Sequence, residues 1–160
     1  MLYNVPQRTS VTLGKPLLEK LAKTENICAI KEASDSSDRM VDLSTLSDNL
    51  ALYCGNDSQI YSTLSLGGLG VVSVVSNICP GTVVRLCKEF FAGRREEALK
   101  IQHALLPLIK TLFLETNPAP VKYAMWRLGL CRSEMRLPMW LPSSVTRKKI
   151  DKILDTLPLL

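Results

Sequence analysis

Three side chains near the start of the sequence are of the types that carry out covalent chemistry on a small carbonyl compound. Lys31 ends the short apolar run 27–30, Tyr3 lies in an earlier apolar segment, and Arg8 follows the turn at Pro6. If the two apolar runs are neighbouring parallel strands, their ends bring ionisable groups to one edge, as at the mouth of a parallel barrel. The spacing therefore predicts a site built from strand ends.

Lys31 is the candidate nucleophile. A lysine reacts only as the free amine, which condenses with a carbonyl group to form a Schiff base. Burial at the end of a strand would favour that form, because a low dielectric disfavours the ammonium ion. Two alternatives stay open: the side chain extends into solvent, which its position alone favours, or it pairs with the adjacent Glu32.

Tyr3 and Arg8 each have a functional and an ordinary interpretation. The Tyr3 phenol is a candidate proton shuttle, although an aromatic residue in a strand is more commonly part of the core. The Arg8 guanidinium would stand at the rim of the strand end and suits a substrate carboxylate, although a lone arginine is more commonly a surface residue. Neither residue identifies a reaction alone.

Other motifs lack support for cofactor or metal chemistry. The segment Gly67-Gly68-Leu69-Gly70 precedes a strand, whereas a dinucleotide fingerprint follows one. His103 is the only histidine and lies in a helical pattern, so we expect no metal site and no cofactor. The five cysteines form no C-x-x-C pair and are expected to be reduced, with Cys28 and Cys54 as small core residues.

The composition is that of a globular protein. The chain has 160 residues, 46% of them hydrophobic, and a formal net charge of +5. Its basic residues are dispersed apart from the run 147–149, so we expect neither nucleic-acid nor membrane partners. The start of the sequence shows no secretory leader, and the expected location is cytoplasmic.

Short apolar runs alternate with amphipathic stretches up to about Cys87, which indicates repeated βα units and a parallel sheet. The predicted strands are 2–4, 27–31, 51–54 and 70–74, and the predicted intervening helices include 16–23, 39–43 and 59–64. After Pro80 only helices are expected, at 82–91, 94–113, 118–128 and 143–157, with an extended linker at 137–142. We place the domain boundary between 1–92, half of a (β/α)8 barrel, and 93–160, a helical region.

Four strands make only half of a closed barrel. An open half-barrel leaves two strand edges without neighbours. We therefore expect the chain to act as a homo-oligomer or to pair with a missing N-terminal half. A non-catalytic half-barrel that serves as an interaction module is the alternative.

Four motifs, in this order, resemble the dihydrodipicolinate synthase family: 2–9 (LYNVPQRT), 30–34 (IKEAS), 55–57 (GND) and 66–74 (LGGLGVVSV). The later segments 106–108, 113–122 and 136–138 also resemble its C-terminal helical region. The resemblance covers essentially the whole chain. It implies the α/β fold of the C-terminal half of a TIM barrel, strands five to eight, followed by a C-terminal helical region.

The resemblance also implies a reaction and its residues. Lys31 would be the Schiff-base lysine for pyruvate, and Tyr3 would donate and accept protons. Arg8 would bind the carboxylate of aspartate semialdehyde, Gly55 would line the pocket, and the Val72 backbone would contact pyruvate. The product would be 4-hydroxy-tetrahydrodipicolinate, in lysine biosynthesis through diaminopimelate, although the chain alone is expected to be impaired. Other class I pyruvate aldolases, such as N-acetylneuraminate lyase or a sugar-acid aldolase, remain the alternative.

Overall fold

The computed structural model describes residues 1–156 of the chain. The chain divides into two compact units, the first from Met1 to Ser73 and the second beginning at Val74. The first unit carries the sheet and all the predicted site residues. Each unit is described by itself below.

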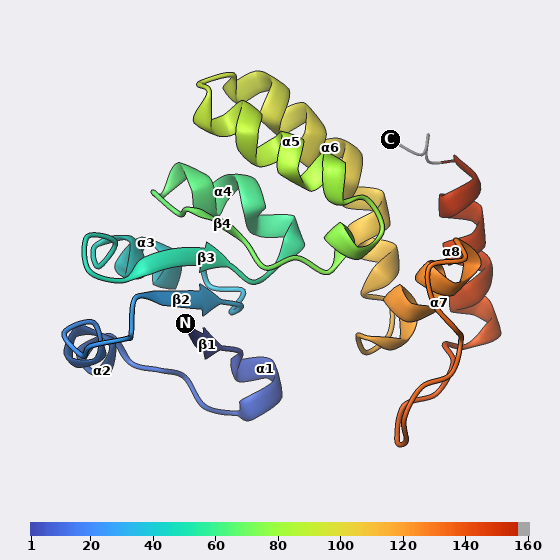
Figure 1. The fold of residues 1–160 in the computed structure, drawn as a ribbon, viewed down its shortest axis with the longest axis horizontal. Coiled ribbons are helices and arrows are strands. Elements are labelled where there is room, and N and C mark those ends of the chain that lie inside the picture. Colours follow the sequence, from blue (N-terminus) through green and yellow to red (C-terminus); the bar gives the residue numbers. More distant parts are fainter. Residues whose placement is uncertain (157–160) are drawn as a thin grey trace. The chain divides into compact units, whose positions relative to one another are not determined.

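The first unit contains a four-stranded parallel sheet in which the strands lie side by side in sequence order, as Figure 1 shows. The strands are β1 (Leu2–Asn4), β2 (Ala29–Glu32), β3 (Ala51–Cys54) and β4 (Gly70–Val71). Its helical segments are α1 (Pro6–Thr9), α2 (Lys15–Leu21), α3 (Ser37–Ser44), the 3-10 turn η1 (Asp57–Gln59) and α4 (Ile60–Ser65). Each of β1, β2 and β3 is thus followed by helical structure, as βα units require.

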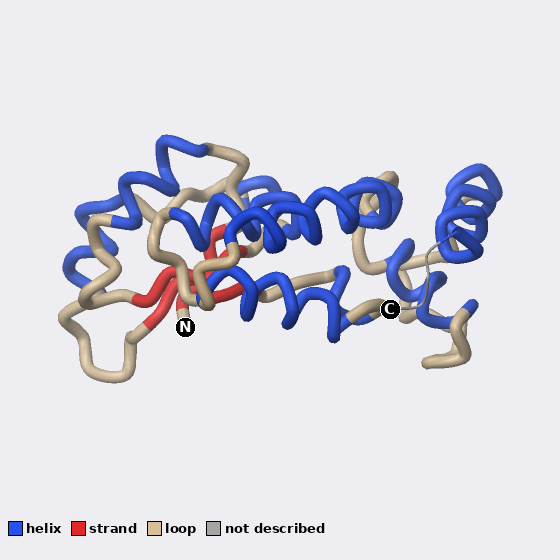
Figure 2. Tube along the Cα trace, turned by 90° about the horizontal axis from the view of Figure 1, so that it is seen from above, coloured by secondary structure: helices blue, strands red, loops and turns tan. Residues whose placement is uncertain are grey.

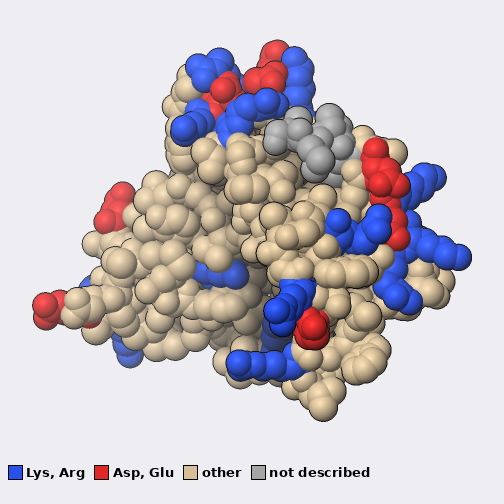
Figure 3. Space-filling view, turned by 45° about the vertical axis from the view of Figure 1, so that its right-hand side comes forward, with Lys and Arg blue, Asp and Glu red and all other residues tan. Residues whose placement is uncertain are grey.

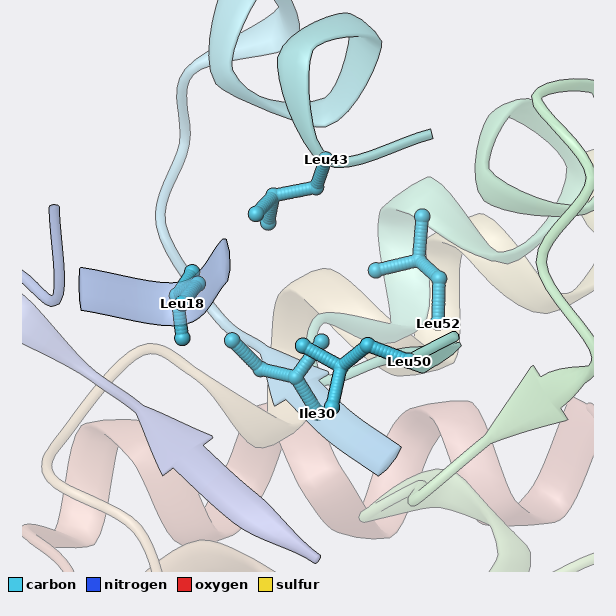
Figure 4. Close-up of a cluster of buried hydrophobic side chains, with 5 residues drawn as sticks. All are labelled: Leu18, Ile30, Leu43, Leu50 and Leu52. Atoms are coloured by element: carbon cyan, nitrogen blue, oxygen red, sulfur yellow. The ribbon is translucent and has the colours of Figure 1, made fainter. Parts of the chain in front are cut away.

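One face of this sheet packs against helices and forms the core. Ile30 and Leu52 point from β2 and β3 toward Leu18 of α2 and Leu43 of α3, with Leu50 beside them (Figure 4). All five side chains are at most 2% exposed. The helix α3 begins at Ser37, two residues before the predicted start, because the Ser36 hydroxyl caps it by accepting a hydrogen bond from the Arg39 amide at 3.2 Å.

Alternation along the strands separates the core from the predicted site. Successive residues of a strand face opposite sides of a sheet. Ile30 faces the helices, so Lys31 faces the other side, together with its register partners Tyr3 on β1 and Tyr53 on β3. Tyr3 is 49% exposed, and Lys31 and Tyr53 are half-buried. The predicted nucleophile therefore lies between two tyrosines on the face opposite the core.

The second unit is helical, as the sequence predicts (Figure 2). It contains the 3-10 turn η2 (Val75–Asn77) and the helices α5 (Pro80–Phe91), α6 (Arg95–Leu112), α7 (Ala119–Arg127) and α8 (Ser144–Thr156). Helix α5 packs against α6, and α8 packs against both α6 and α7. Gly93, with φ of 81°, provides the left-handed turn between α5 and α6 that other residues adopt only with strain.

A polar contact also joins α7 to α8. The Tyr123 hydroxyl lies 3.0 Å from one carboxylate oxygen of Asp151, and the Arg127 Nε lies 2.9 Å from the same oxygen. Burial and the neighbouring carboxylate raise the pKa of Tyr123 above its ordinary value. The phenol therefore stays protonated and donates to Asp151.

Most predicted elements are confirmed, and the differences lie at their ends. Strands 2–4 and 51–54 are observed as predicted, whereas β4 covers only Gly70–Val71 of the predicted 70–74. The prediction that Cys28 is a core residue is wrong: β2 begins at Ala29, and Cys28, before the alternation starts, is exposed. Helix α8 ends at Thr156, and Leu157 of the predicted helix lies outside the described residues.

The predicted domain boundary after residue 92 stays a prediction. The second compact unit begins at Val74, so α5 belongs to it, although a helix that follows β4 is also expected in a βα repeat.

On the face shown in Figure 3, basic and acidic side chains are interspersed. Of the helices formed by residues 1–156, none combines the length and the apolar character that crossing a membrane requires.

Candidate active site

The structure brings two predicted catalytic residues into direct contact. Tyr3 and Lys31 are register partners on the parallel strands β1 and β2. The Lys31 Nζ lies 4.0 Å from the centroid of the Tyr3 ring. At this distance the ring face stabilises an ammonium ion by about 0.5–1 kcal/mol at an exposed site. The predicted nucleophile and the predicted proton-transferring phenol thus stand side by side.

The alternative in which Lys31 pairs with Glu32 is wrong. Glu32 is the next residue of β2, so its side chain points to the helix face of the sheet, where it is fully buried. There the Glu32 carboxylate pairs with the Arg39 Nε at 2.9 Å. The Lys31 ammonium group therefore contacts the Tyr3 ring and does not form an ion pair with Glu32.

Arg8 lies on the one-turn helix α1, directly after β1, and is exposed. One contact holds this helix at the strand ends: the Gln7 side chain donates to the Asp35 carboxylate at 3.0 Å. The helix itself is closed by the Ser10 amide, which donates to the Pro6 carbonyl at 2.9 Å. Because Asp35 follows β2, α1 is tied to the same edge of the sheet at which Lys31 is found.

Gly55 has a packing reason to be glycine. Its amide donates to the Glu32 carbonyl at 2.7 Å, and a Cβ at this position would lie 2.6 Å from the Ala33 Cβ. A side chain would therefore force β3 away from β2 at the end where Lys31 is located. Whether Gly55 also lines a substrate pocket stays a prediction.

Val72 follows β4 and is 41% exposed. Its amide donates to the Cys54 carbonyl at 2.9 Å, which continues the ladder between β3 and β4 by one residue. This bond occupies the Val72 N–H, so a backbone contact with a substrate would have to use the carbonyl oxygen. In the predicted contact, the Val72 backbone can therefore act only as a hydrogen-bond acceptor, through its carbonyl oxygen.

Sequence reasoning missed three residues around this site. Tyr53 is the second register neighbour of Lys31, and its ring lies 3.4 Å from where a Cβ of Gly70 would be, so Gly70 leaves room for it. Asn4 and Arg39 bind the buried Glu32 carboxylate. The strand pattern contained a signal for Tyr53, because residues 3 and 53 are each next to last in the predicted strands 2–4 and 51–54.

The profile of the Dihydrodipicolinate synthetase family matches residues 1–157. The chain belongs to this family. Among curated members, the 4-hydroxy-tetrahydrodipicolinate synthase of Endomicrobium trichonymphae is 43% identical over 161 aligned positions, which cover all of this chain and 55% of that protein. The enzyme of the same name from Clostridium novyi is 44% identical over 140 positions, with 87% of this chain and 47% of that protein covered.

Solved structures of the dihydrodipicolinate synthetase family share the fold of this chain. The dihydrodipicolinate synthase of Thermotoga maritima superposes with a TM-score of 0.95 at 37% identity, covering 99% of this chain and 55% of that one. The Aquifex aeolicus enzyme gives a TM-score of 0.90 at 37% identity, covering 96% and 53%. The family prediction and the fold class are confirmed: the chain has half the strands of a (β/α)8 barrel, followed by helices. It spans about half the length of the curated relatives that it matches.

Proposed function

We propose that this chain carries the Schiff-base half of the active site of a 4-hydroxy-tetrahydrodipicolinate synthase. Family membership supports the reaction class, and the curated relatives described above carry this enzyme's name, which does not favour the sibling aldolases. The observation that carries the assignment is the Lys31 Nζ, 4.0 Å from the Tyr3 ring at the end of adjacent parallel strands. Pyruvate and aspartate semialdehyde are the proposed substrates.

The first step uses Lys31. Its free amine attacks the C2 carbonyl of pyruvate, the carbonyl oxygen takes up protons and leaves as water, and an imine joins Nζ to C2. Tyr3 is beside Nζ and is the proposed group that passes protons to the departing oxygen. Loss of a proton from C3 of the imine then gives an enamine, which is the carbon nucleophile for the aldehyde of the second substrate.

The remaining residues would bind the substrates. Arg8 is exposed on α1 and presents a planar guanidinium, which suits the carboxylate of aspartate semialdehyde. Gly55 keeps the ends of β2 and β3 close together beside Lys31. The Val72 carbonyl, after the end of β4, is the proposed backbone acceptor for the hydroxyl of the adduct that pyruvate first forms on Lys31.

The proposal includes a partner that completes the barrel. In the described sheet, β1 and β4 each pair with one neighbour only, and Tyr3 is 49% exposed. A polypeptide that supplies further strands, either a second copy or the N-terminal half of the relatives, would cover these edges. Sedimentation of the purified chain should show a dimer or larger species, and a well-behaved folded monomer would contradict pairing between copies. The expected cytoplasmic location belongs to the same proposal.

Trapping with borohydride tests the assignment of Lys31. The chain is incubated with pyruvate, reduced, digested and analysed by mass spectrometry, and the expected product is a carboxyethyl group on the peptide that contains Lys31. Lys31→Arg should abolish the product, whereas Lys110→Arg on α6 should leave it unchanged. Absence of the product from the wild-type chain, both alone and when mixed with the N-terminal half of a relative, would refute the proposed function.

A further inference from the structure

A buried carboxylate lies directly behind the proposed site. Glu32 follows Lys31 in β2 and is 0% exposed. Its carboxylate accepts hydrogen bonds from the Asn4 side chain at 2.8 and 3.0 Å, from the Ser34 amide at 2.8 Å and from the Arg39 Nε at 2.9 Å. These donors come from β1, from the segment after β2 and from α3. The Glu32 carboxylate thus joins three elements of the first unit.

The same network closes the loop that carries Arg8. The Leu13 amide donates to the Asn4 Oδ1 at 3.0 Å, and the Leu13 carbonyl accepts from the Arg39 Nη2 at 2.7 Å. Both backbone groups of Leu13 are therefore held, one by β1 and one by α3. The loop between Asn4 and Leu13 contains α1, on which Arg8 lies.

Each member of the network in the strands is the sequence neighbour of a proposed catalytic residue. Asn4 follows Tyr3, and Glu32 follows Lys31. Asn4 and Glu32 are themselves register partners, as are Tyr3 and Lys31. Fixing the first pair on the helix face therefore fixes the second pair on the opposite face, because a slip of β1 against β2 would break the bonds between the Asn4 and Glu32 side chains.

Stability alone does not require a buried ion pair at this place. Replacing such a pair with apolar side chains of similar volume is often neutral or stabilising, because removing two charges from water is costly. An apolar cluster would, however, lack the directed bonds that hold a particular strand register and loop. The arrangement of donors around Glu32 supplies such directed bonds to β1, α3 and Leu13.

We infer that Asn4, Glu32 and Arg39 form a positioning network that sets the Lys31 amine against the Tyr3 phenol and holds the loop bearing Arg8. None of the three is proposed to touch a substrate. This inference rests on the proposed function, since it assigns a purpose to the alignment of the proposed catalytic residues. A displacement of about 1 Å at a reacting group can reduce a rate by about 100-fold.

The first test measures the borohydride-trapping rate against pyruvate concentration, per folded molecule and well below each variant's unfolding midpoint. Arg39→Ala should lower the maximal rate roughly 10- to 100-fold, with a smaller change in the half-saturating pyruvate concentration. Arg39→Lys keeps the charge beside Glu32 but lacks the second nitrogen for Leu13, so it should restore part of the rate. Arg94→Ala, which removes the ion pair with Glu89 on the second unit, is the matched control and should trap at the wild-type rate.

A second readout does not depend on pyruvate. Nuclear Overhauser contacts between the Lys31 side chain and the Tyr3 ring should be present in the wild type and in Arg94→Ala, and weakened or absent in Arg39→Ala. A merely structural role for the network would leave both these contacts and the trapping rate of the folded fraction unchanged, and that result would overturn the inference. If Arg39→Ala does not fold, the same comparison is made with Arg39→Lys, for which unchanged contacts and rate would likewise overturn it.

The two readouts separate the two proposals. A wild-type chain that traps no pyruvate refutes the proposed function, whereas the contact between Lys31 and Tyr3 still reports on the network. A wild-type chain that traps pyruvate, with Arg39→Ala equally reactive, refutes the network and leaves the assignment of Lys31 in place.

Discussion

Lys31 and Tyr3 face each other across β1 and β2, with the Lys31 Nζ 4.0 Å from the centre of the phenol ring. The contact joins an amine to the ring face, and the hydroxyl extends beyond it. The ring and the hydroxyl of Tyr3 thus have separable effects: the ring face stabilises a cation, and the hydroxyl is the group proposed to transfer protons.

Tyr3→Phe should therefore slow trapping of pyruvate on Lys31 by roughly 100-fold or more, because the ring stays and the proton-transferring group is lost. The measurement is the rate of carboxyethylation of the Lys31 peptide. Tyr123→Phe, which removes a hydrogen-bonded phenol from the second unit, should leave that rate unchanged. A Tyr3→Phe chain that is trapped as fast as the wild type would show that the hydroxyl has no part in imine formation.

Gly55→Ala should destabilise the first unit by about 1–3 kcal/mol, since the new methyl group would overlap the Ala33 Cβ and the Glu32 carbonyl oxygen. Urea unfolding monitored by circular dichroism measures the change. Gly81→Ala is the control: nothing lies within 4 Å of its Cβ position in α5, and alanine is favoured over glycine in a helix by about 0.5–1 kcal/mol. Equal stability of Gly55→Ala and the wild type would exclude the packing reason given for this glycine.

Leu52→Ala should cost about 2–5 kcal/mol of unfolding free energy, because Leu52 is 0% exposed in the cluster that joins the sheet to α2 and α3. Leu17→Ala on α2 is the matched control. Its side chain is 46% exposed, and the change should stay within about 0.5 kcal/mol. Similar losses for the two variants would mean that this cluster is not the core of the first unit.

The charged Glu115 carboxylate should stabilise the second unit, and this stabilisation should be lost in acid. The Thr146 and Ser143 hydroxyls and the Ser143 amide hold the pKa of the Glu115 carboxyl below its ordinary value. The folded state thus favours the charged form, so the stabilisation is complete above the ordinary pKa of the carboxyl and is lost as the pH falls through the lowered one. The melting temperature of Glu115→Gln should lie below that of the wild type at neutral pH, and the two should converge on acidification.

Ser143→Ala removes the cap of α8 together with the hydroxyl that donates to the Glu115 carboxylate at 2.7 Å. The Ser143 hydroxyl accepts from the Thr146 amide at 3.3 Å, and its loss should cost about 1 kcal/mol. A Glu115→Gln chain whose deficit in melting temperature did not shrink in acid would show that the carboxylate charge is not what stabilises this helix.

The sequence was sufficient to predict the fold class, because alternation of short apolar runs with amphipathic stretches depends on local patterns. Strand ends were less certain. Of the predicted fourth strand 70–74, Gly70 and Val71 have register partners on β3, and the Val72 amide adds one further bond. A strand also needs a neighbour to pair with, and the local pattern does not supply one. Cys28 was misplaced for the same reason: it extends the apolar run but precedes the pairing of β2.

The candidate site was predicted in part. Two strand ends indicated that Tyr3 and Lys31 would be neighbours, and the structure shows them in contact. The partner of Glu32 was not predicted, because Arg39 lies on a helix whose rotation toward the sheet follows only from tertiary packing. The pair between Lys31 and Glu32 is excluded by alternation along β2, because adjacent residues of a strand face opposite sides of the sheet.

Mutations on the two faces of the sheet are expected to have different effects. Because adjacent residues point in opposite directions, Tyr3, Lys31, Tyr53 and Gly70 form one row, and Asn4, Glu32 and Cys54 form another on the reverse side. A library that varies Tyr53 and Gly70 would sample different surroundings for the Lys31 amine without altering the side chains that hold the strands in register. Laboratory evolution of the proposed site could therefore vary the face that carries Lys31, while the Asn4 and Glu32 side chains on the other face keep β1 and β2 in register.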